Sequence, residues 1–160
     1  MDKVALLSAR ERSELFEASA GKRGIKPAIV EKDFWVCWVI KKLFESKDLA
    51  DHLVFKGGTS LSKVHGVIHR FSEDIDLVLN WELLGYGRDE QDPWEEQPSK
   101  TQLDRFNQEF NQRARTHIGN VMFPTVTDLL AVCPAVGARI SPNDAHLIEI
   151  EYPAAFSLSA

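Results

Sequence analysis

Two aspartates stand one residue apart within a short apolar segment of the sequence. Asp74 and Asp76 alternate with apolar residues in the stretch 74–79, Asp-Ile-Asp-Leu-Val-Leu. Because alternate residues of a β-strand point to the same face, a strand here would project both carboxylates together. Two such carboxylates repel each other, and a bound Mg²⁺ or Mn²⁺ would relieve that repulsion through the oxygen ligands these cations prefer. The spacing predicts a divalent metal site, and the alternative is an edge strand whose aspartates face water.

A pair of glycines lies upstream of the aspartates, after a short apolar stretch over 53–55. Gly57 and Gly58 are followed by Thr59 and Ser60, where we expect a short helix to begin. Glycine lets the backbone approach a ligand closely, and the first turn of a helix offers unpaired N–H groups to an anion. The turn therefore predicts a triphosphate site, and the alternative is a tight strand-to-helix turn that binds nothing. Its spacing is not that of a Walker loop, which needs GxxxxGK followed by Ser or Thr.

Other charged residues could complete such a site. Lys56, Lys63 and Arg70 bracket the glycines and aspartates and are candidate phosphate ligands, although each alone also fits a surface charge. A third carboxylate is available in the stretch 147–152, where Glu149 and Glu151 alternate with apolar residues. On a strand both would share one face, so the pattern leaves open which of them joins the aspartates and whether both are simply solvated.

The elements that must position these residues follow from hydrophobic periodicity and from start and stop signals. Ser8 and Glu11 form a capping-box pattern that predicts a helix to about Ala20, with Leu15 and Phe16 facing inward. The expected elements are helices over 9–20, 27–46, 59–67, 101–118 and 125–132 and strands over 53–55, 75–79 and 147–152. An exposed loop is expected over 80–98. This order predicts an α+β fold with a small mixed sheet and flanking helices.

Length and composition limit the class of protein. The chain has 160 residues, 27% of them charged, and a formal net charge of −5. A general nucleic-acid binder is usually basic, so the acidic charge argues against a coat protein but allows one local contact with RNA. The two cysteines, Cys37 and Cys133, predict neither a disulfide framework nor a zinc site. No signal peptide or membrane span is expected, and we therefore expect a cytoplasmic protein.

The glycine and aspartate motifs in this order resemble the AbiEii/AbiGii toxin family of polymerase-beta-like nucleotidyltransferases. The resemblance is carried by Phe-Lys-Gly-Gly-Thr-Ser-Leu-Ser-Lys at 55–63, by Arg-Phe-Ser-Glu-Asp-Ile-Asp-Leu at 70–77 and by Val-Glu-Lys-Asp-Phe-Trp-Val at 30–36. It covers about residues 25–80 firmly and the remainder loosely. It implies N-terminal helices over 1–50 that pack on a polymerase-beta-like nucleotidyltransferase core over 51–160.

The resemblance also implies roles for the candidate residues. An NTP would be held by Lys56, Gly57, Gly58, Thr59, Ser60, Lys63 and Arg70. Asp74 and Asp76 would ligate the catalytic Mg²⁺ or Mn²⁺, and the place of Glu151 before an aromatic residue makes it the third carboxylate, with Glu149 as the alternate. The expected reaction transfers a nucleoside monophosphate to a nucleic-acid acceptor, tRNA first among them, by two-metal catalysis. The expected setting is a bacterial toxin–antitoxin or phage-defence system, with a cognate antitoxin as partner.

The chain differs from that family in length. Family members usually run to nearly twice this size and carry a second, mostly helical half, of which this sequence shows no counterpart before Ala160. We therefore expect the apolar surface that such a half would cover to be exposed. One alternative function is a catalytically inactive core that serves as a nucleotide- or antitoxin-binding module. Another is a nucleotidyltransferase that acts on small molecules, which the acidic net charge would suit.

Overall fold

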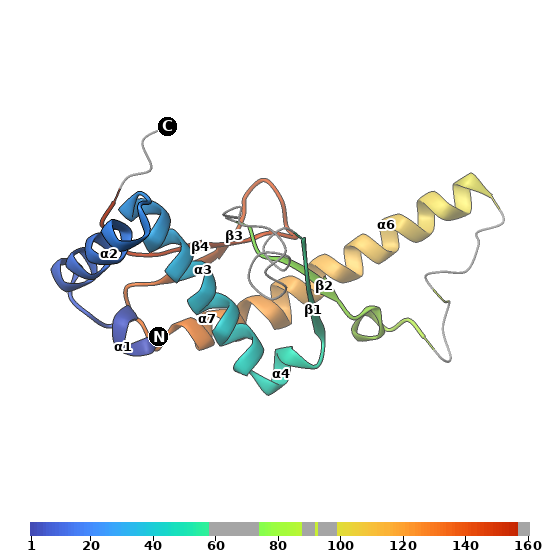
Figure 1. Cartoon of the computed structure of the whole chain (residues 1–160). Coiled ribbons are helices and arrows are strands. Elements are labelled where there is room, and N and C mark those ends of the chain that lie inside the picture. The colour runs from blue at the N-terminus through green and yellow to red at the C-terminus, as the bar shows by residue number, and fades with distance from the viewer. Residues whose placement is uncertain (58–73, 88–91, 93–98, 157–160) are drawn as a thin grey trace.

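The computed structural model describes residues 1–57, 74–87, 92 and 99–156 (Figure 1). The predicted nucleotide ligands Gly58, Thr59, Ser60, Lys63 and Arg70 lie outside the described residues. The helix expected over 59–67 lies outside them as well, so these features stay predictions.

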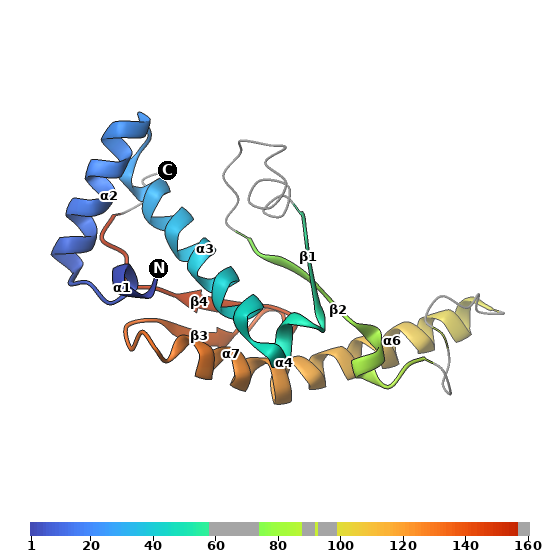
Figure 2. The same ribbon diagram turned by 60° about the horizontal axis from the view of Figure 1, so that its bottom comes forward.

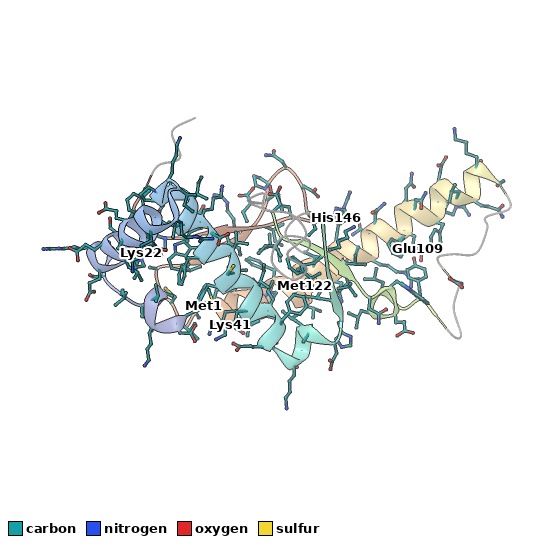
Figure 3. The ribbon with its side chains drawn as sticks, viewed as in Figure 1. Met1, Lys22, Lys41, Glu109, Met122 and His146 are labelled. Carbon is teal, nitrogen blue, oxygen red and sulfur yellow. The ribbon has the colours of Figure 1, made fainter. Side chains whose placement is uncertain are left out.

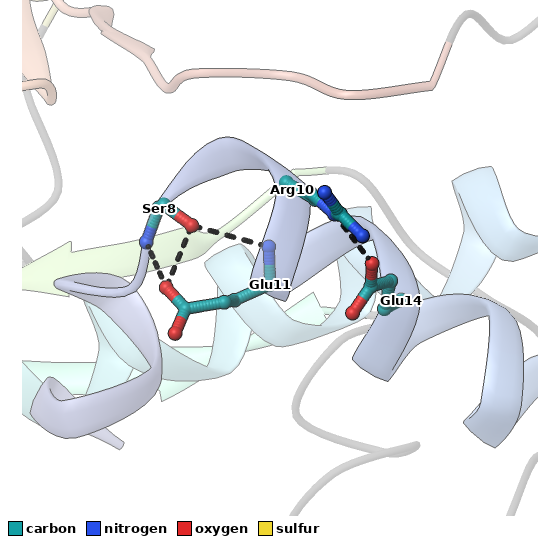
Figure 4. Close-up of polar contacts among 4 residues, drawn as sticks. All are labelled: Ser8, Arg10, Glu11 and Glu14. Carbon is teal, nitrogen blue, oxygen red and sulfur yellow. Dashed lines mark hydrogen bonds and ion pairs between the residues drawn. The ribbon is translucent and has the colours of Figure 1, made fainter.

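The chain begins with two helices, α1 (Asp2–Ala5) and α2 (Ala9–Arg23). The predicted capping box at the start of α2 is confirmed (Figure 4). The backbone N–H of Ser8 donates to Oε2 of Glu11 at 2.9 Å, and the N–H of Glu11 donates to Oγ of Ser8 at 3.3 Å. Two otherwise unpaired N–H groups are thereby satisfied, which fixes where α2 begins.

Helix α2 buries only a narrow stripe. Its buried residues, Arg12, Phe16 and Ala20, are spaced four apart and therefore lie above one another on one face. The predicted inward position of Leu15 is wrong, since 44% of this residue is exposed. Neighbouring helical residues point about 100° apart, so Leu15 lies outside the stripe that contains Phe16.

Helix α3 (Pro27–Glu45) crosses the molecule beside α2, and the short helix α4 (Lys47–Ala50) follows it (Figure 2). Proline suits the first helical position because its missing N–H would be unpaired there in any case. The apolar residues of α3 lie nearly all round the helix, which predicts burial on several sides. This prediction is confirmed, since Trp35, Trp38 and Val39 are all buried.

Four short strands form two antiparallel ladders in the described part of the chain. β1 (Leu53–Lys56) pairs with β2 (Asp76–Leu79), and β3 (Gly137–Ile140) pairs with β4 (Ile148–Glu151). The α+β class is confirmed. The strands described do not join in one mixed sheet, because β4 takes as its partner β3, a strand that the sequence did not predict.

The segment between β2 and β3 is largely helical. The 3₁₀ turn η1 (Trp81–Leu84) follows β2. Helix α6 (Lys100–His117) continues through the π-helical turn η2 (Ile118–Met122) into α7 (Phe123–Leu130). The first part of α6 extends away from the rest of the molecule (Figures 1 and 2).

Two expectations for this segment are corrected. Helix α6 starts earlier than predicted, because its cap is Ser99, whose hydroxyl accepts the N–H three residues further on at 3.3 Å. The loop expected after β2 is not exposed throughout. Tyr86 is buried there, since its ring packs on Phe106 and Phe110 of α6 with centroids 5.5 and 5.3 Å apart.

The main hydrophobic core lies between α3, α7 and the inner faces of the strands. Its buried residues are Ala5, Trp35, Trp38, Val39, Leu43, Leu49, Leu53, Met122, Val126, Leu130, Cys133 and Val136 (Figure 3 labels Met122). Partly buried residues of β2 and β4, among them Leu77 and Ile150, pack against it. The expected division of the chain at residue 50 stays a prediction, although this core contains residues from both sides of it.

Candidate active site between helix α3 and strands β2 and β4

The two aspartates lie at the start of strand β2. The predicted alternation is confirmed, because Asp74 and Asp76 are exposed, whereas Ile75 and Leu77 are partly buried against the main core. Antiparallel pairing places Asp76 opposite Lys56 of β1. Burial of one face of the strand fixes its register and holds the Asp76 carboxylate on the opposite face. Asp74 lies two residues before the strand and is exposed as well.

The glycine motif meets the aspartate motif at Gly57. This residue follows β1 directly and has a left-handed φ of 77°. A Cβ built on Gly57 would lie 2.0 Å from Oδ2 of Asp76 and 2.8 Å from its Cγ, which is closer than non-bonded atoms approach. Both the backbone conformation and the available space therefore require glycine. Gly57 therefore lies directly against the carboxylate of Asp76.

A cavity of about 600 Å³ opens beside the aspartates. Its charged lining comes from Lys32 of α3, from Asp74 and Asp76 at β2, and from Glu149 of β4, and its apolar lining includes Trp35, Val36 and Tyr152. This volume lies within the range of small-molecule sites, which commonly combine apolar walls with a few convergent polar groups. The geometry therefore fits a ligand with both apolar and charged parts.

Of the two candidates for a third carboxylate, Glu149 lines the cavity and Glu151 does not. Both side chains pair with Arg139 of β3, Glu149 at 2.7 Å and Glu151 at 3.2 Å, but Glu149 is 31% exposed and Glu151 is 67% exposed. A hydrogen bond from Ser141, and to a smaller extent one from Arg139, lowers the pKa of Glu149. The hydrogen bond between Arg139 and Glu149 also raises the pKa of Arg139. The role of Glu151 stays a prediction, and the position of the cavity favours its alternate, Glu149.

The donors at the cavity fit a cation that takes few ligands from protein. Across residues 1–57, 74–87, 92 and 99–156, no three His, Cys, Asp or Glu side chains are placed to hold one metal ion together. Mg²⁺ commonly binds through one or two carboxylates together with substrate phosphates and water, rather than in a cage made of protein alone. Asp74 and Asp76 supply such a pair of oxygen ligands, so they fit Mg²⁺ or Mn²⁺ that arrives with a nucleotide.

The structure adds a basic residue that sequence analysis did not select. Lys32 lines the cavity, whereas Lys56, the predicted phosphate ligand on β1, is exposed and does not line it. Lys32 was visible only as a member of the segment 30–36, one of the three that carry the family resemblance. On a helix that is apolar nearly all round, spacing alone does not indicate which residue faces the strands.

Comparison with known proteins relates this site to a family. The family model described as Nucleotidyl transferase AbiEii toxin, Type IV TA (toxin–antitoxin) system, matches residues 40–160, a region that contains Asp74, Asp76 and Glu149. No curated protein and no solved structure matches the chain. Within the part of the chain that the structure describes, no helix combines the length and the apolar character needed to cross a membrane.

Proposed function

Since the chain belongs to the AbiEii family of nucleotidyl transferase toxins of type IV toxin–antitoxin systems, we propose that it transfers a nucleoside monophosphate from an NTP to a nucleic-acid acceptor. The acceptor class to test first is tRNA. The proposed partner is a cognate antitoxin, and the proposed setting is phage defence in the bacterial cytoplasm.

The proposal is supported above all by the junction of Gly57 with Asp76 at the wall of the cavity. A Cβ added to Gly57 would lie 2.0 Å from Oδ2 of Asp76, so the turn approaches a carboxylate that would carry a cation without a side chain in between. A phosphate chain bound through a divalent cation needs both features, because the cation binds the carboxylates while backbone N–H groups contact the phosphates. Asp74 adds the second carboxylate to the same cavity.

Each residue of the proposed site has a separate task. Asp74 and Asp76 would hold Mg²⁺ or Mn²⁺, which when bound supplies charge neutralisation at the phosphates and lowers the pKa of an attacking hydroxyl. Glu149 would add negative charge on the facing strand. The predicted ligands Gly58, Thr59, Ser60, Lys63 and Arg70 would cradle the NTP with Gly57. The acceptor hydroxyl then bonds to the α-phosphorus as pyrophosphate leaves.

A transfer assay tests this function. The wild type is incubated with Mg²⁺, a tRNA pool and each of ATP, CTP, GTP and UTP labelled at the α-phosphorus. We expect label on tRNA with at least one NTP, and a loss of rate on the order of a hundredfold or more in Asp74→Ala and Asp76→Ala, because charge stabilisation by a bound metal is worth several kcal/mol. Asp104→Ala is the matched control, since Asp104 is exposed on α6 and does not line the cavity.

Binding is measured separately by calorimetric titration of each NTP with Mg²⁺ into the wild type and the Asp74→Ala/Asp76→Ala variant. Full transfer activity in Asp74→Ala would rule out the proposed mechanism. Magnesium-dependent binding without transfer would favour the alternative of a nucleotide-binding module.

A further inference from the structure

Lys32 is the one basic side chain among the described residues that line the cavity. It is partly buried on α3, while Asp74, Asp76 and Glu149 line the same cavity from β2 and β4. A lysine can bury its aliphatic stem along apolar surface and still extend its ammonium group toward a ligand. Its position therefore allows a positive charge to act inside a cavity that otherwise gathers carboxylates.

The part of α3 that carries Lys32 is fixed to the segment that follows β4. Glu31, which is 1% exposed, accepts hydrogen bonds from the backbone N–H groups of residues 155–156 at 2.8 and 3.0 Å. One turn further along α3, the buried ring of Trp35 stacks on Tyr152 with centroids 5.5 Å apart. These contacts join α3 to the segment after β4 at positions before and after Lys32, so the lysine is held at a fixed place in the cavity wall.

The cavity is lined by one lysine and three carboxylates, which suits a polyanion that binds together with a divalent cation. Asp74 and Asp76 line the cavity as the carboxylates proposed for a divalent ion, and Glu149 on β4 pairs with Arg139 at 2.7 Å. A triphosphate carries more negative charge than one Mg²⁺ neutralises. An ammonium group in the facing wall would therefore bind the remaining phosphate oxygens through charge-assisted hydrogen bonds.

We propose that the ammonium group of Lys32 binds the triphosphate of the NTP and makes the site prefer nucleoside triphosphates over monophosphates. This inference rests on the proposed function, because it takes the cavity as the NTP site. It adds to the site a ligand from α3 that lies outside the family match over 40–160. Lys56, the basic residue at the strand end, does not line the cavity and is not needed for this role.

The test compares variants that change only the charge of a lysine on α3. Lys32→Met removes the ammonium group but keeps a long aliphatic side chain, and Lys32→Arg keeps the positive charge. Lys41→Met is the matched control, because Lys41 lies on the same helix, pairs with Glu45 at 3.4 Å and does not line the cavity (Figure 3). Calorimetric titrations with saturating Mg²⁺ use the four common NTPs, the corresponding NMPs and inorganic tripolyphosphate.

We expect Lys32→Met to weaken the binding of the NTP and of tripolyphosphate about tenfold to a hundredfold, the usual worth of a hydrogen bond to a charged group. The binding of the NMP should change by less than about threefold, Lys32→Arg should restore most of the loss, and Lys41→Met should match the wild type. Circular dichroism checks that each variant folds, and Lys32→Gln replaces Lys32→Met if the latter does not.

The outcomes separate this inference from the proposed function. If the wild type binds an NTP, the Asp74→Ala/Asp76→Ala variant does not, and Lys32→Met binds as well as the wild type, the inference is wrong and the proposed function stands. Equal losses of NTP and NMP binding in Lys32→Met also contradict the inference, since they indicate a structural role. If the wild type binds no NTP in the presence of Mg²⁺, both the function and the inference fail.

Discussion

Among the described residues, the two sequence motifs meet where Gly57 lies against Asp76. At this position a side chain would have to displace the Asp76 carboxylate, because even a Cβ would lie 2.0 Å from Oδ2. The φ of 77° adds a second constraint, since residues other than glycine are strained in the left-handed region. A substitution at Gly57 should therefore lower the stability of the fold through backbone strain and disturb the site by displacing the Asp76 carboxylate. These two effects can be measured separately.

Gly57→Ala should abolish magnesium-dependent NTP binding and lower the free energy of unfolding by about 1–3 kcal/mol. Gly24→Ala is the matched control, because Gly24 has a similar φ of 66° but no atom within 4 Å of an added Cβ. It should cost about 1 kcal/mol of strain and leave binding intact. Urea denaturation and calorimetric titration measure the two effects. Loss of binding in both variants would mean that the contact with Asp76 is not responsible.

A second prediction at this scale separates Glu149 from Glu151. Glu149→Gln removes a charge from the cavity wall and should reduce kcat/KM for nucleotide transfer on the order of tenfold or more. Glu151→Gln changes an exposed partner of Arg139 that does not line the cavity, and should stay within about twofold of the wild type. The reverse order of effects would support Glu151 as the third carboxylate, as the family resemblance implies.

At the scale of elements, strong local sequence signals were sufficient to predict individual helices and strands. The Ser8 capping box, the proline that opens α3 and the alternation around Asp76 each predicted an element that the structure contains. Strand β3 was missed because its sequence, Gly-Ala-Arg-Ile at 137–140, has a single β-branched residue and too few positions to establish a period. Its stability comes from pairing with β4, which no local pattern reveals.

The limits of prediction at the site have the same origin. Glu149 and Glu151 are two residues apart on one strand, so the sequence could not tell which of them faces the cavity. Lys32 was not selected because the part of α3 that meets the strands depends on the packing of the whole helix. In both cases the missing information is how one element packs against its neighbour, and only the tertiary structure supplies it.

Glu31 joins two such elements and gives a prediction at this scale. Glu31→Ala leaves two backbone N–H groups of the segment after β4 without their acceptor, so the free energy of unfolding should fall by about 2–5 kcal/mol. NTP binding should also weaken, because α3 and β4 form facing walls of the cavity. Glu14→Ala, which removes a surface ion pair with Arg10, should stay within about 0.5 kcal/mol. Chemical denaturation compares the two variants, and similar losses would contradict the assigned role of Glu31.

At the scale of the whole molecule, the walls of the site and the main core both join segments that are far apart in the sequence. The core combines Ala5 and Trp38 with Leu53 and Leu130. Asp2 accepts a hydrogen bond from the Trp38 indole N–H at 2.8 Å, so the first helix is also tied to α3. Since these contacts cross residue 50, we expect the N-terminal helices and the rest of the described chain to unfold together.

Leu130→Ala tests this expectation, because Leu130 is 1% exposed in the main core and its truncation should cost about 2–5 kcal/mol. If the core is shared, the whole transition moves to lower temperature: near-ultraviolet and far-ultraviolet circular dichroism keep the same midpoint, and the calorimetric and van't Hoff enthalpies agree. Val132→Ala, two residues further on and 50% exposed, should shift the midpoint little.

Two transitions, of which Leu130→Ala moves only one, would show instead that residues 1–50 and 51–160 fold as separate units. In that case α3 would form its wall of the cavity by docking onto an independent core, and nucleotide binding should be lost at the first transition rather than the second.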